Sequence, residues 1–349
     1  MLPLDRIDIH THLLPPQLPR WADRFGYGGF IGLQPTAAPC RATMVRDDGT
    51  VFREVSSNLW DPEVRLAEMD DTQVRVQVLS TVPAMFSYWA EPDHGLDVAQ
   101  FLNDHTAQTV ARRPDRFVGL GTLPMQDPQR AMGELERCVL QLGLAGVQVG
   151  SHVQGRHGHW NLGDAQLLPV WRRAAELGAA IFVHPWDMMG ESTMTRYWLP
   201  WLVGMPAEAS RALCSLIFAG VFQQLPTLRL CVAHGGGSFP ATIGRIAHGH
   251  AARPDLCAVD NPLPPTADLG RFWVDALVHD ARALQLVVDV VGSNRVAVGS
   301  DYPFPLGESR PGALVDAMPF DTATRRRILS DNALDWLGLD AGLRPRRPQ

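Results

Sequence analysis

Eight short apolar runs recur along the whole chain and constrain its fold more than any other feature of the sequence. They are rich in Val, Ile and Leu and occupy residues 6–10, 74–81, 117–123, 146–150, 180–184, 228–234, 272–276 and 296–301. Parallel strands that are covered by helices are buried on both faces, so they read as nearly continuous hydrophobic runs. The pattern therefore predicts eight buried parallel strands.

Amphipathic segments separate these runs and are predicted to be helices, at residues 62–71, 96–113, 128–142, 164–177, 207–219, 239–250 and 281–291. Eight alternations of strand and helix favour a closed α/β barrel over an open sheet, and 349 residues suffice for one barrel with insertions. We predict a (β/α)₈ TIM-type barrel that forms a single domain over residues 1–349.

Two long stretches interrupt the alternation of strands and helices. Residues 13–59 are rich in Pro and Gly and are predicted to form a small insertion after the first strand. Residues 186–206 follow the fifth strand and carry Trp186, Trp198 and Trp201 together with several methionines. A connection as long as the first is usually a functional lid or a small subdomain in a compact domain.

Charge and hydropathy exclude several classes of partner. The net charge of −6 offers no basic surface for nucleic acid. No apolar run reaches the roughly 18 residues that span a bilayer, and the first residues lack the basic and apolar regions of a signal peptide, so a cytoplasmic location is expected. The five cysteines are widely spread and form no C-x-x-C pair, which favours reduced thiols over a disulfide framework.

The sequence contains no lysine, because all 31 of its Lys and Arg residues are arginine. A Schiff-base lysine for pyridoxal phosphate and the lysine of a Walker-A loop are therefore excluded. A carbamylated lysine that bridges two metal ions is excluded for the same reason. If the chain binds metal in a barrel, a site for one ion is expected.

Potential metal ligands occur at four of the predicted strand ends. His10 and His12 end the first strand, and their i, i+2 spacing places both imidazoles on one face. His184, His234 and Asp301 end the fifth, sixth and eighth strands. A single histidine there is more often a hydrogen-bonded core residue, and an isolated aspartate is often a helix cap. The conjunction at strand ends, where barrels hold their active sites, instead predicts a metal centre. Three of these imidazoles together with the carboxylate suit Zn²⁺ with an open position.

Three further histidines lie close together after the fourth predicted strand, in the segment SHVQGRHGHW. His152, His157 and His159 are numerous enough for a second metal site. The Gly-rich surroundings favour a solvated loop, which is the interpretation adopted for this segment.

The motifs at these positions resemble the amidohydrolase superfamily and, within it, the family of 2-amino-3-carboxymuconate 6-semialdehyde decarboxylases. The similarity extends over residues 5–338 and rests on RIDIHTH, LWDPEVRLAEMD, VHPWDMMG, WLPWLVGMPAE, HGGGSF and GSDYPFPLGE. The resemblance implies one Zn²⁺ bound by His10, His12, His184 and Asp301. It assigns His234 to acid/base chemistry on metal-activated water beside Asp301, with no organic cofactor. Mn²⁺ and Co²⁺ are accepted by the same ligand types.

The resemblance also implies how a small dicarboxylate substrate is held. Arg53 is expected to bind a substrate carboxylate, and Arg245 is expected to bind another across the interface of a homodimer. Trp198 and Phe304 are expected to line the pocket. The alternatives from the residues alone are surface salt bridges for the arginines and plain packing for the tryptophans. A lysine that the family often has before Arg53 is absent, and Arg41 or Arg46 is the candidate replacement.

The implied activity is the non-oxidative decarboxylation of 2-amino-3-carboxymuconate 6-semialdehyde to 2-aminomuconate 6-semialdehyde and CO₂, in tryptophan–kynurenine or nitrobenzoate catabolism. Two alternatives remain within the superfamily: a decarboxylase of an aromatic acid of the resorcylate or salicylate type, and a hydrolase with one metal ion. A metal-binding barrel without catalysis is a third, which the intact His234 disfavours.

Overall fold

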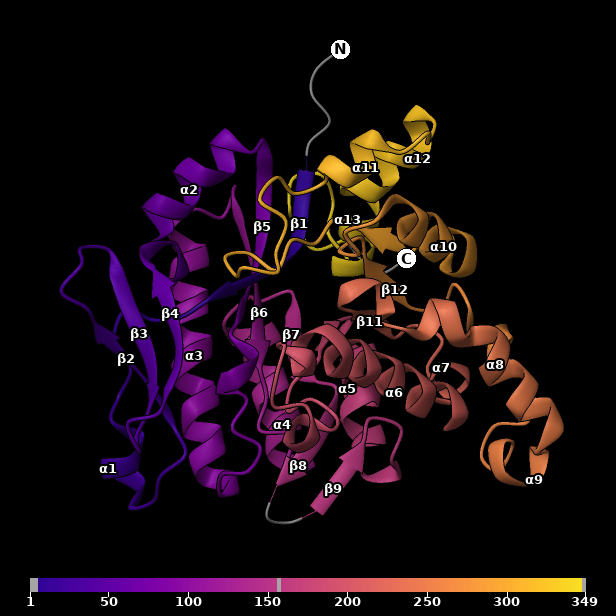
Figure 1. Cartoon of the computed structure of the whole chain (residues 1–349), viewed down its shortest axis with the longest axis horizontal. Helices are drawn as coiled ribbons and strands as arrows, with labels where there is room; N and C mark the ends of the chain where they lie inside the picture. The colour runs from indigo at the N-terminus through magenta and orange to yellow at the C-terminus, as the bar shows by residue number, and fades with distance from the viewer. Residues whose placement is uncertain (1–5, 156–157, 347–349) are drawn as a thin grey trace.

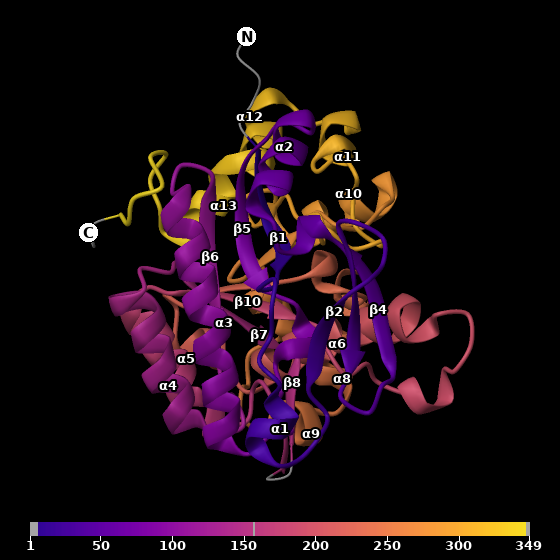
Figure 2. The same cartoon turned by 90° about the vertical axis from the view of Figure 1, so that its left-hand side faces the viewer.

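Eight parallel strands form the centre of the molecule in the order β1-β5-β6-β7-β10-β11-β12-β13. The structure is a computed structural model and describes residues 6–155 and 158–346. The strands are β1 Arg6–Leu13, β5 Val74–Thr81, β6 Phe117–Thr122, β7 Gly146–Gly150, β10 Ala180–His184, β11 Arg229–Val232, β12 Trp273–Asp275 and β13 Val296–Ala297. Figures 1 and 2 show helices around this sheet.

The two ends of the strand order are joined through the segment that follows β13. The backbone N–H of Ile9 donates to Val298 at 2.9 Å, and that of His12 donates to Tyr302 at 2.7 Å. Thr11 and Tyr302 form a parallel bridge. These bonds close the sheet into a (β/α)₈ barrel, which confirms the predicted fold class.

Helices follow the strands in alternation. They are α2 Pro62–Asp71, α3 Pro92–Arg112, α4 Pro128–Glu136, α5 Leu168–Leu177, α6 Met205–Phe218, α7 Val221–Gln224, α8 Phe239–Ala252, α9 Pro254–Cys257, α10 Ala281–Val291, α11 Ala313–Ala317, α12 Thr322–Arg326 and α13 Asn332–Leu337. None of the helices in the described ranges combines the length and apolar character needed to cross a bilayer.

Local sequence explains where several of these helices begin and end. The Asp61 side chain accepts a hydrogen bond from the N–H of Glu63, and Pro62 takes the first helical position of α2, where no donor is needed. α5 ends at Leu177 and is followed by Gly178, whose φ of 62° is most readily adopted without a side chain. α3 begins at Pro92, before the predicted residue 96, because proline favours the first turn.

Apolar side chains fill the layer between the strands and the surrounding helices. Val147 and Val183 from the strands pack in one cluster with Leu135 of α4, Trp171 of α5 and Leu213 of α6. All five side chains are fully buried. At roughly 25 cal/mol per Å² of apolar surface, such burial is the main stabilising contribution to the fold.

The predicted insertion is not a plain loop. It contains the short helix α1 Trp21–Phe25 and an antiparallel sheet of β2 Ile31–Pro35, β3 Arg41–Arg46 and β4 Val51–Ser56. Its apolar face, including Met44, shares a core cluster with Val98 and Leu102 of α3. Figure 1 shows this indigo sheet beside α3. The insertion therefore stands at a defined place against the barrel.

The predicted sixth, seventh and eighth strands are too long. β11 ends at Val232, before His234, and β13 ends at Ala297, before Asp301. Both side chains lie on irregular backbone with positive φ, 56° at His234 and 57° at Asp301. The apolar runs report burial, which continues past the point where strand pairing stops.

Candidate active site

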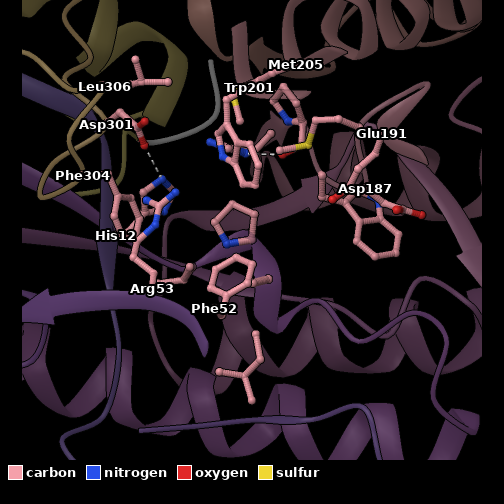
Figure 3. A pocket seen from close by; sticks show the side chains of 18 of the residues that line it. His12, Phe52, Arg53, Asp187, Glu191, Trp201, Met205, Asp301, Phe304 and Leu306 are labelled. Atoms are coloured by element: carbon pink, nitrogen blue, oxygen red, sulfur yellow. Dashed lines mark hydrogen bonds and ion pairs between the residues drawn. The ribbon is translucent and has the colours of Figure 1, made fainter. Parts of the chain in front are cut away.

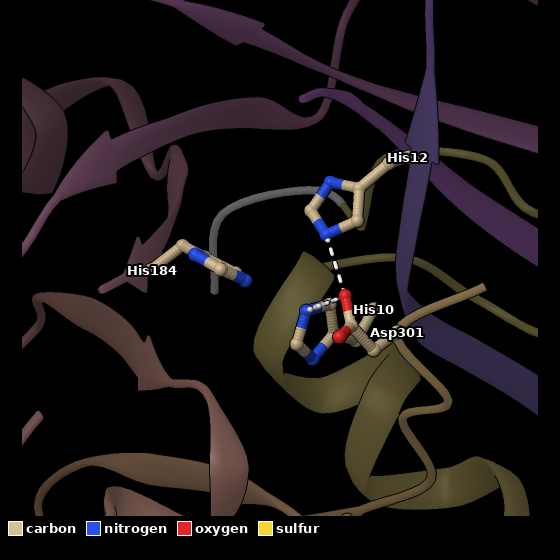
Figure 4. Close-up of side chains that lie close together, drawn as sticks. All are labelled: His10, His12, His184 and Asp301. Atoms are coloured by element: carbon tan, nitrogen blue, oxygen red, sulfur yellow. Dashed lines mark hydrogen bonds and ion pairs between the residues drawn. The ribbon is translucent and has the colours of Figure 1, made fainter. Parts of the chain in front are cut away.

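Four side chains from three parts of the barrel converge on one point. His10 and His12 come from β1, His184 ends β10, and Asp301 lies on the segment that closes the barrel. One donor atom from each lies within 4.8 Å of the donors of the other three. Figure 4 shows the four side chains turned toward a common centre. The structure thus brings together the set that the sequence singled out.

The second ring nitrogen of each clustered histidine is engaged by an oxygen outside the cluster. Nδ1 lies 2.7 Å from the Asp275 carboxylate in His10, 3.0 Å from the Thr81 carbonyl in His12 and 2.7 Å from the Pro185 carbonyl in His184. An acceptor at Nδ1 holds the proton there and leaves the Nε2 lone pair free to bind a metal. All three imidazoles are therefore oriented as metal ligands.

The donor set fits a divalent cation. Within residues 6–155 and 158–346, Nε2 of His10 and Nε2 of His184 have no hydrogen-bond partner although both are buried. Nε2 of His12 lies 3.0 Å from Oδ1 of Asp301, which lies 3.4 Å from Nε2 of His10. Buried polar atoms without partners are rare in proteins. A cation at this point would engage them, so the chain has a metal-binding site.

The charges of the cluster also support a metal-binding site. Burial lowers the pKa of His184 well below its usual range, so the ring is neutral, as a metal ligand must be. Burial also opposes the charge of His10, but its contacts with Asp275 and Asp301 prevail and raise its pKa to about 10. Burial would raise the pKa of Asp301, yet the contacts with His10 and His12 hold it well below its usual range. Two buried carboxylates thus attract positive charge to the centre.

His234 lies beside the cluster but outside the set of four donors. Its Nε2 is 4.0 Å from Oδ2 of Asp301, and its ring centroid is 5.0 Å from that of His10 and 5.1 Å from that of His184. Burial, together with the charge of His10, lowers the pKa of His234 to about 4. The imidazole is therefore neutral at pH 7 and can accept a proton.

A pocket of about 300 Å³ opens on one side of the centre and is lined by His12, His184 and Asp301. Arg53 of the insertion and Phe304 also line it (Figure 3). Arg46 of the insertion and Trp198 belong to the lining as well. The Arg53 guanidinium lies 4.6 Å from the centroid of the Phe304 ring. Burial lowers the pKa of Arg53. The pocket therefore combines aromatic walls with cationic groups next to the metal site.

The structure separates the remaining arginine candidates. Arg41 is exposed and lies outside the pocket lining, so only Arg46 is placed to replace a lysine there. Arg245 is exposed on α8 and does not line the pocket of its own chain. Trp186 and Trp201 line the pocket as Trp198 does.

The prediction of a solvated loop after the fourth strand is wrong for His152. It lies in a hairpin of β8 His152–Gly155 and β9 Gly158–Asn161, is 1% exposed, and pairs with Glu208 at 3.0 Å. Trp186 stacks on its ring, which excludes water. His159 contacts Arg211 at 2.6 Å, and His157 lies outside the described residues. Among the residues described, only the four-ligand cluster could hold a metal.

Sequence reasoning missed Asp275 and Thr81, which hold His10 and His12. Asp275 ends β12, so a rule that treats every polar side chain at a strand end as a candidate would have found it. The carbonyl of Thr81 carries no side-chain signal and could not have been found.

A family model described as amidohydrolase matches residues 7–339, and the chain belongs to this family. Within it, the chain is 54% identical to 2-amino-3-carboxymuconate-6-semialdehyde decarboxylase of Dictyostelium discoideum, over 96% of the chain and 92% of that protein. It is 39% identical to the protein of the same name from Caenorhabditis elegans, over 97% and 95%.

A solved structure has a similar fold. A 5-carboxyvanillate decarboxylase of Novosphingobium aromaticivorans, with bound manganese and 3-methoxy-4-hydroxy-5-nitrobenzoic acid, is 27% identical and superimposes with a TM-score of 0.71. The match covers 81% of this chain and 83% of that one.

Proposed function

We propose that the protein decarboxylates 2-amino-3-carboxymuconate 6-semialdehyde to 2-aminomuconate 6-semialdehyde, a step in tryptophan–kynurenine or nitrobenzoate breakdown. The observation that carries the proposal is a four-ligand metal centre that opens into a pocket lined by Arg46 and Arg53. The 54% identity to a decarboxylase of this name supports the choice of substrate. The insertion and the barrel line one pocket, so we treat the whole chain as one metal-dependent domain.

We propose that the resident metal is one Zn²⁺, bound by His10, His12, His184 and Asp301. A set of imidazoles with one carboxylate is typical of catalytic zinc, although Mn²⁺ and Co²⁺ bind the same ligand types. A bound ion supplies Lewis-acid polarisation and makes a water molecule more acidic. The absence of lysine supports a centre with a single ion.

The reaction breaks the bond between a carbon and its carboxylate, leaves the electron pair on that carbon, and replaces CO₂ by a proton. The conjugated semialdehyde delocalises the electron pair, so no organic cofactor is required. We assign the proton transfers to Nε2 of His234, which is neutral and faces Oδ2 of Asp301 at 4.0 Å. We propose that Asp301, besides binding the metal, assists these transfers as the carboxylate that faces His234.

Arg53 and Arg46 are proposed to bind the carboxylates of the substrate, and both belong to the subunit whose pocket they line. Phe304 and Trp198 form apolar walls of the same pocket. A guanidinium fork matches a carboxylate with two parallel hydrogen bonds. We further propose a homodimer in which Arg245 reaches the pocket of the partner. Its exposure on α8 supports this, because it leaves the guanidinium available to a second subunit.

The decisive experiment is incubation of the zinc-loaded protein with freshly prepared aminocarboxymuconate semialdehyde, while its visible absorbance and the released CO₂ are followed. Loss of absorbance with one CO₂ per substrate is expected. Protein stripped of metal by a chelator serves as the control and should be inactive. Unchanged absorbance with zinc-loaded protein would refute the assignment.

The second candidate is an aromatic-acid decarboxylase. Its support is the aromatic lining of the pocket and the relative that was solved with a substituted nitrobenzoic acid. Turnover of a resorcylate or salicylate in place of the semialdehyde would favour it. Hydrolysis of a lactone or amide would indicate the hydrolase alternative, and tight metal binding without any turnover would indicate a non-catalytic barrel.

Arg53→Ala is expected to lower kcat/KM by about 10- to 100-fold, mostly by raising KM. A hydrogen-bonded charge pair in such a site contributes about 1.5–3 kcal/mol, and 1.4 kcal/mol is tenfold. Arg53→Lys should recover only part of the loss, since an ammonium lacks the planar fork. Steady-state kinetics measure both. Arg41→Ala is the matched control outside the pocket; an equal loss there would contradict the assignment.

A further inference from the structure

The carboxylate of Asp275 lies between two functional elements that are far apart in the sequence. Asp275 is the last residue of β12 and is fully buried. Its Oδ2 accepts a hydrogen bond from Nδ1 of His10 at 2.7 Å. Its Oδ1 accepts hydrogen bonds from the backbone N–H of Gly235 at 2.8 Å and of Leu277 at 3.2 Å. One side chain thus contacts a metal ligand and the turn that carries His234.

That turn needs external support, because its backbone is unusual. His234 has φ 56°, and the next three glycines have φ 62°, 76° and 65°. Left-handed backbone is unfavourable for a residue with a side chain and persists only where the surroundings hold it. The hydrogen bond from Gly235 N to Asp275 is a contact from outside the turn that opposes its relaxation. Loss of that acceptor would leave His234 free to move away from Asp301.

We propose that Asp275 is a positioning residue that sets His10 for metal binding and His234 for proton transfer at the same time. The second half rests on the function proposed above. The site chemistry requires both groups to face one centre. His10 lies on β1 and His234 follows β11, and these two strands do not pair with each other. A single carboxylate, bonded to both, fixes their relative placement, which explains why it is buried beside the centre.

The proposal requires a carboxylate rather than any polar side chain. Each oxygen of Asp275 faces N–H donors, so the group must accept at both ends. An asparagine of the same shape has one oxygen and one NH₂, and it would turn a donor toward either His10 or Gly235. The isosteric variant is therefore expected to fail almost as severely as alanine.

The test uses zinc-loaded Asp275→Asn and Asp275→Ala, with folding checked by circular dichroism. Competition with a chromophoric chelator should show zinc binding weakened by roughly 10- to 100-fold, the usual effect of losing an outer partner of a ligand histidine. At saturating zinc, kcat should still be reduced tenfold or more, because excess metal cannot restore the His234 turn. Should the amide variant not fold, Asp275→Glu replaces it: its longer side chain displaces both acceptor oxygens, so the same losses of zinc affinity and kcat are expected.

A double variant separates positioning from general destabilisation. If Asp275 acts on turnover through His234, Asp275→Asn should lower kcat no further in a His234→Ala background. Glu134→Gln is the matched control, since Glu134 is a buried carboxylate on α4 that is bonded to Asn103 and Arg137 away from the centre. It should keep the zinc affinity and kcat of the parent.

Unchanged zinc affinity in Asp275→Asn would overturn the His10 half of the proposal. Full recovery of kcat by zinc, or additive losses in the double variant, would overturn the His234 half. The zinc measurement needs no substrate, so it remains valid if the parent protein fails to decarboxylate the semialdehyde. In that case a crystal structure of zinc-loaded Asp275→Asn tests the second half, and an unmoved His234 would overturn it.

Discussion

Replacement of His234 by alanine is expected to lower kcat by about 10²- to 10⁴-fold, the range in which a positioned general acid or base contributes to a rate. The zinc content should stay at that of the parent protein. The reason is geometric: Nε2 of His234 stands 4.0 Å from Asp301 and outside the four-donor cluster. Steady-state kinetics measure the expected loss of kcat, and metal analysis of the same preparation measures the zinc content.

His279→Asn is the control for this variant. His279 is an exposed histidine with φ 58°, a conformation that asparagine tolerates, so its replacement should leave kcat unchanged. Parental turnover in His234→Ala would refute the acid/base role. Loss of zinc from His234→Ala would instead make His234 a ligand and would enlarge the proposed set.

Asp301→Ala and His184→Ala are expected to release zinc on dialysis and to abolish turnover. Each removes one of four ligands from a buried cluster, so the affinity should fall by more than the roughly 10- to 100-fold that an outer partner contributes. Asp301→Ala also leaves its partner His12 without the carboxylate 3.0 Å away. Atomic absorption and the chelator competition measure the stoichiometry and the affinity.

Asp289→Ala, which removes an exposed carboxylate on α10, should retain one zinc per chain and full activity. The ligand assignment would be wrong if Asp301→Ala or His184→Ala kept stoichiometric zinc after dialysis. Added zinc should restore little activity to Asp301→Ala, because that side chain also faces His234.

The barrel was predictable because burial leaves a direct trace in the sequence. β5, β7 and β10 coincide with their predicted runs, and α2 and α10 with their predicted helices. The predicted strand ends were less accurate where the chain stays buried after strand pairing stops, as in the segment that follows β13. The insertion was predicted, but its sheet was not. Polar and apolar residues alternate only weakly there, and turn-forming residues such as Pro and Gly are frequent.

His10, His12, His184, His234 and Asp301 were singled out because each lies at or just beyond a predicted strand end, and barrels gather those ends at one mouth. The family resemblance left His234 out of the ligand set, and the other four form the cluster that the structure shows. The expectation of a single metal ion also came from the sequence, through the absence of lysine. Neither conclusion depends on side-chain packing.

Only the tertiary structure decided which residues support the centre. Asp275 holds His10 from 265 positions away, Arg46 rather than Arg41 lines the pocket, and His152 is buried under Trp186. The physical reason is that hydrophobic periodicity reports whether a residue is buried, not which distant segment it meets. That partner is set by closure of the barrel and by the way the insertion packs on α3.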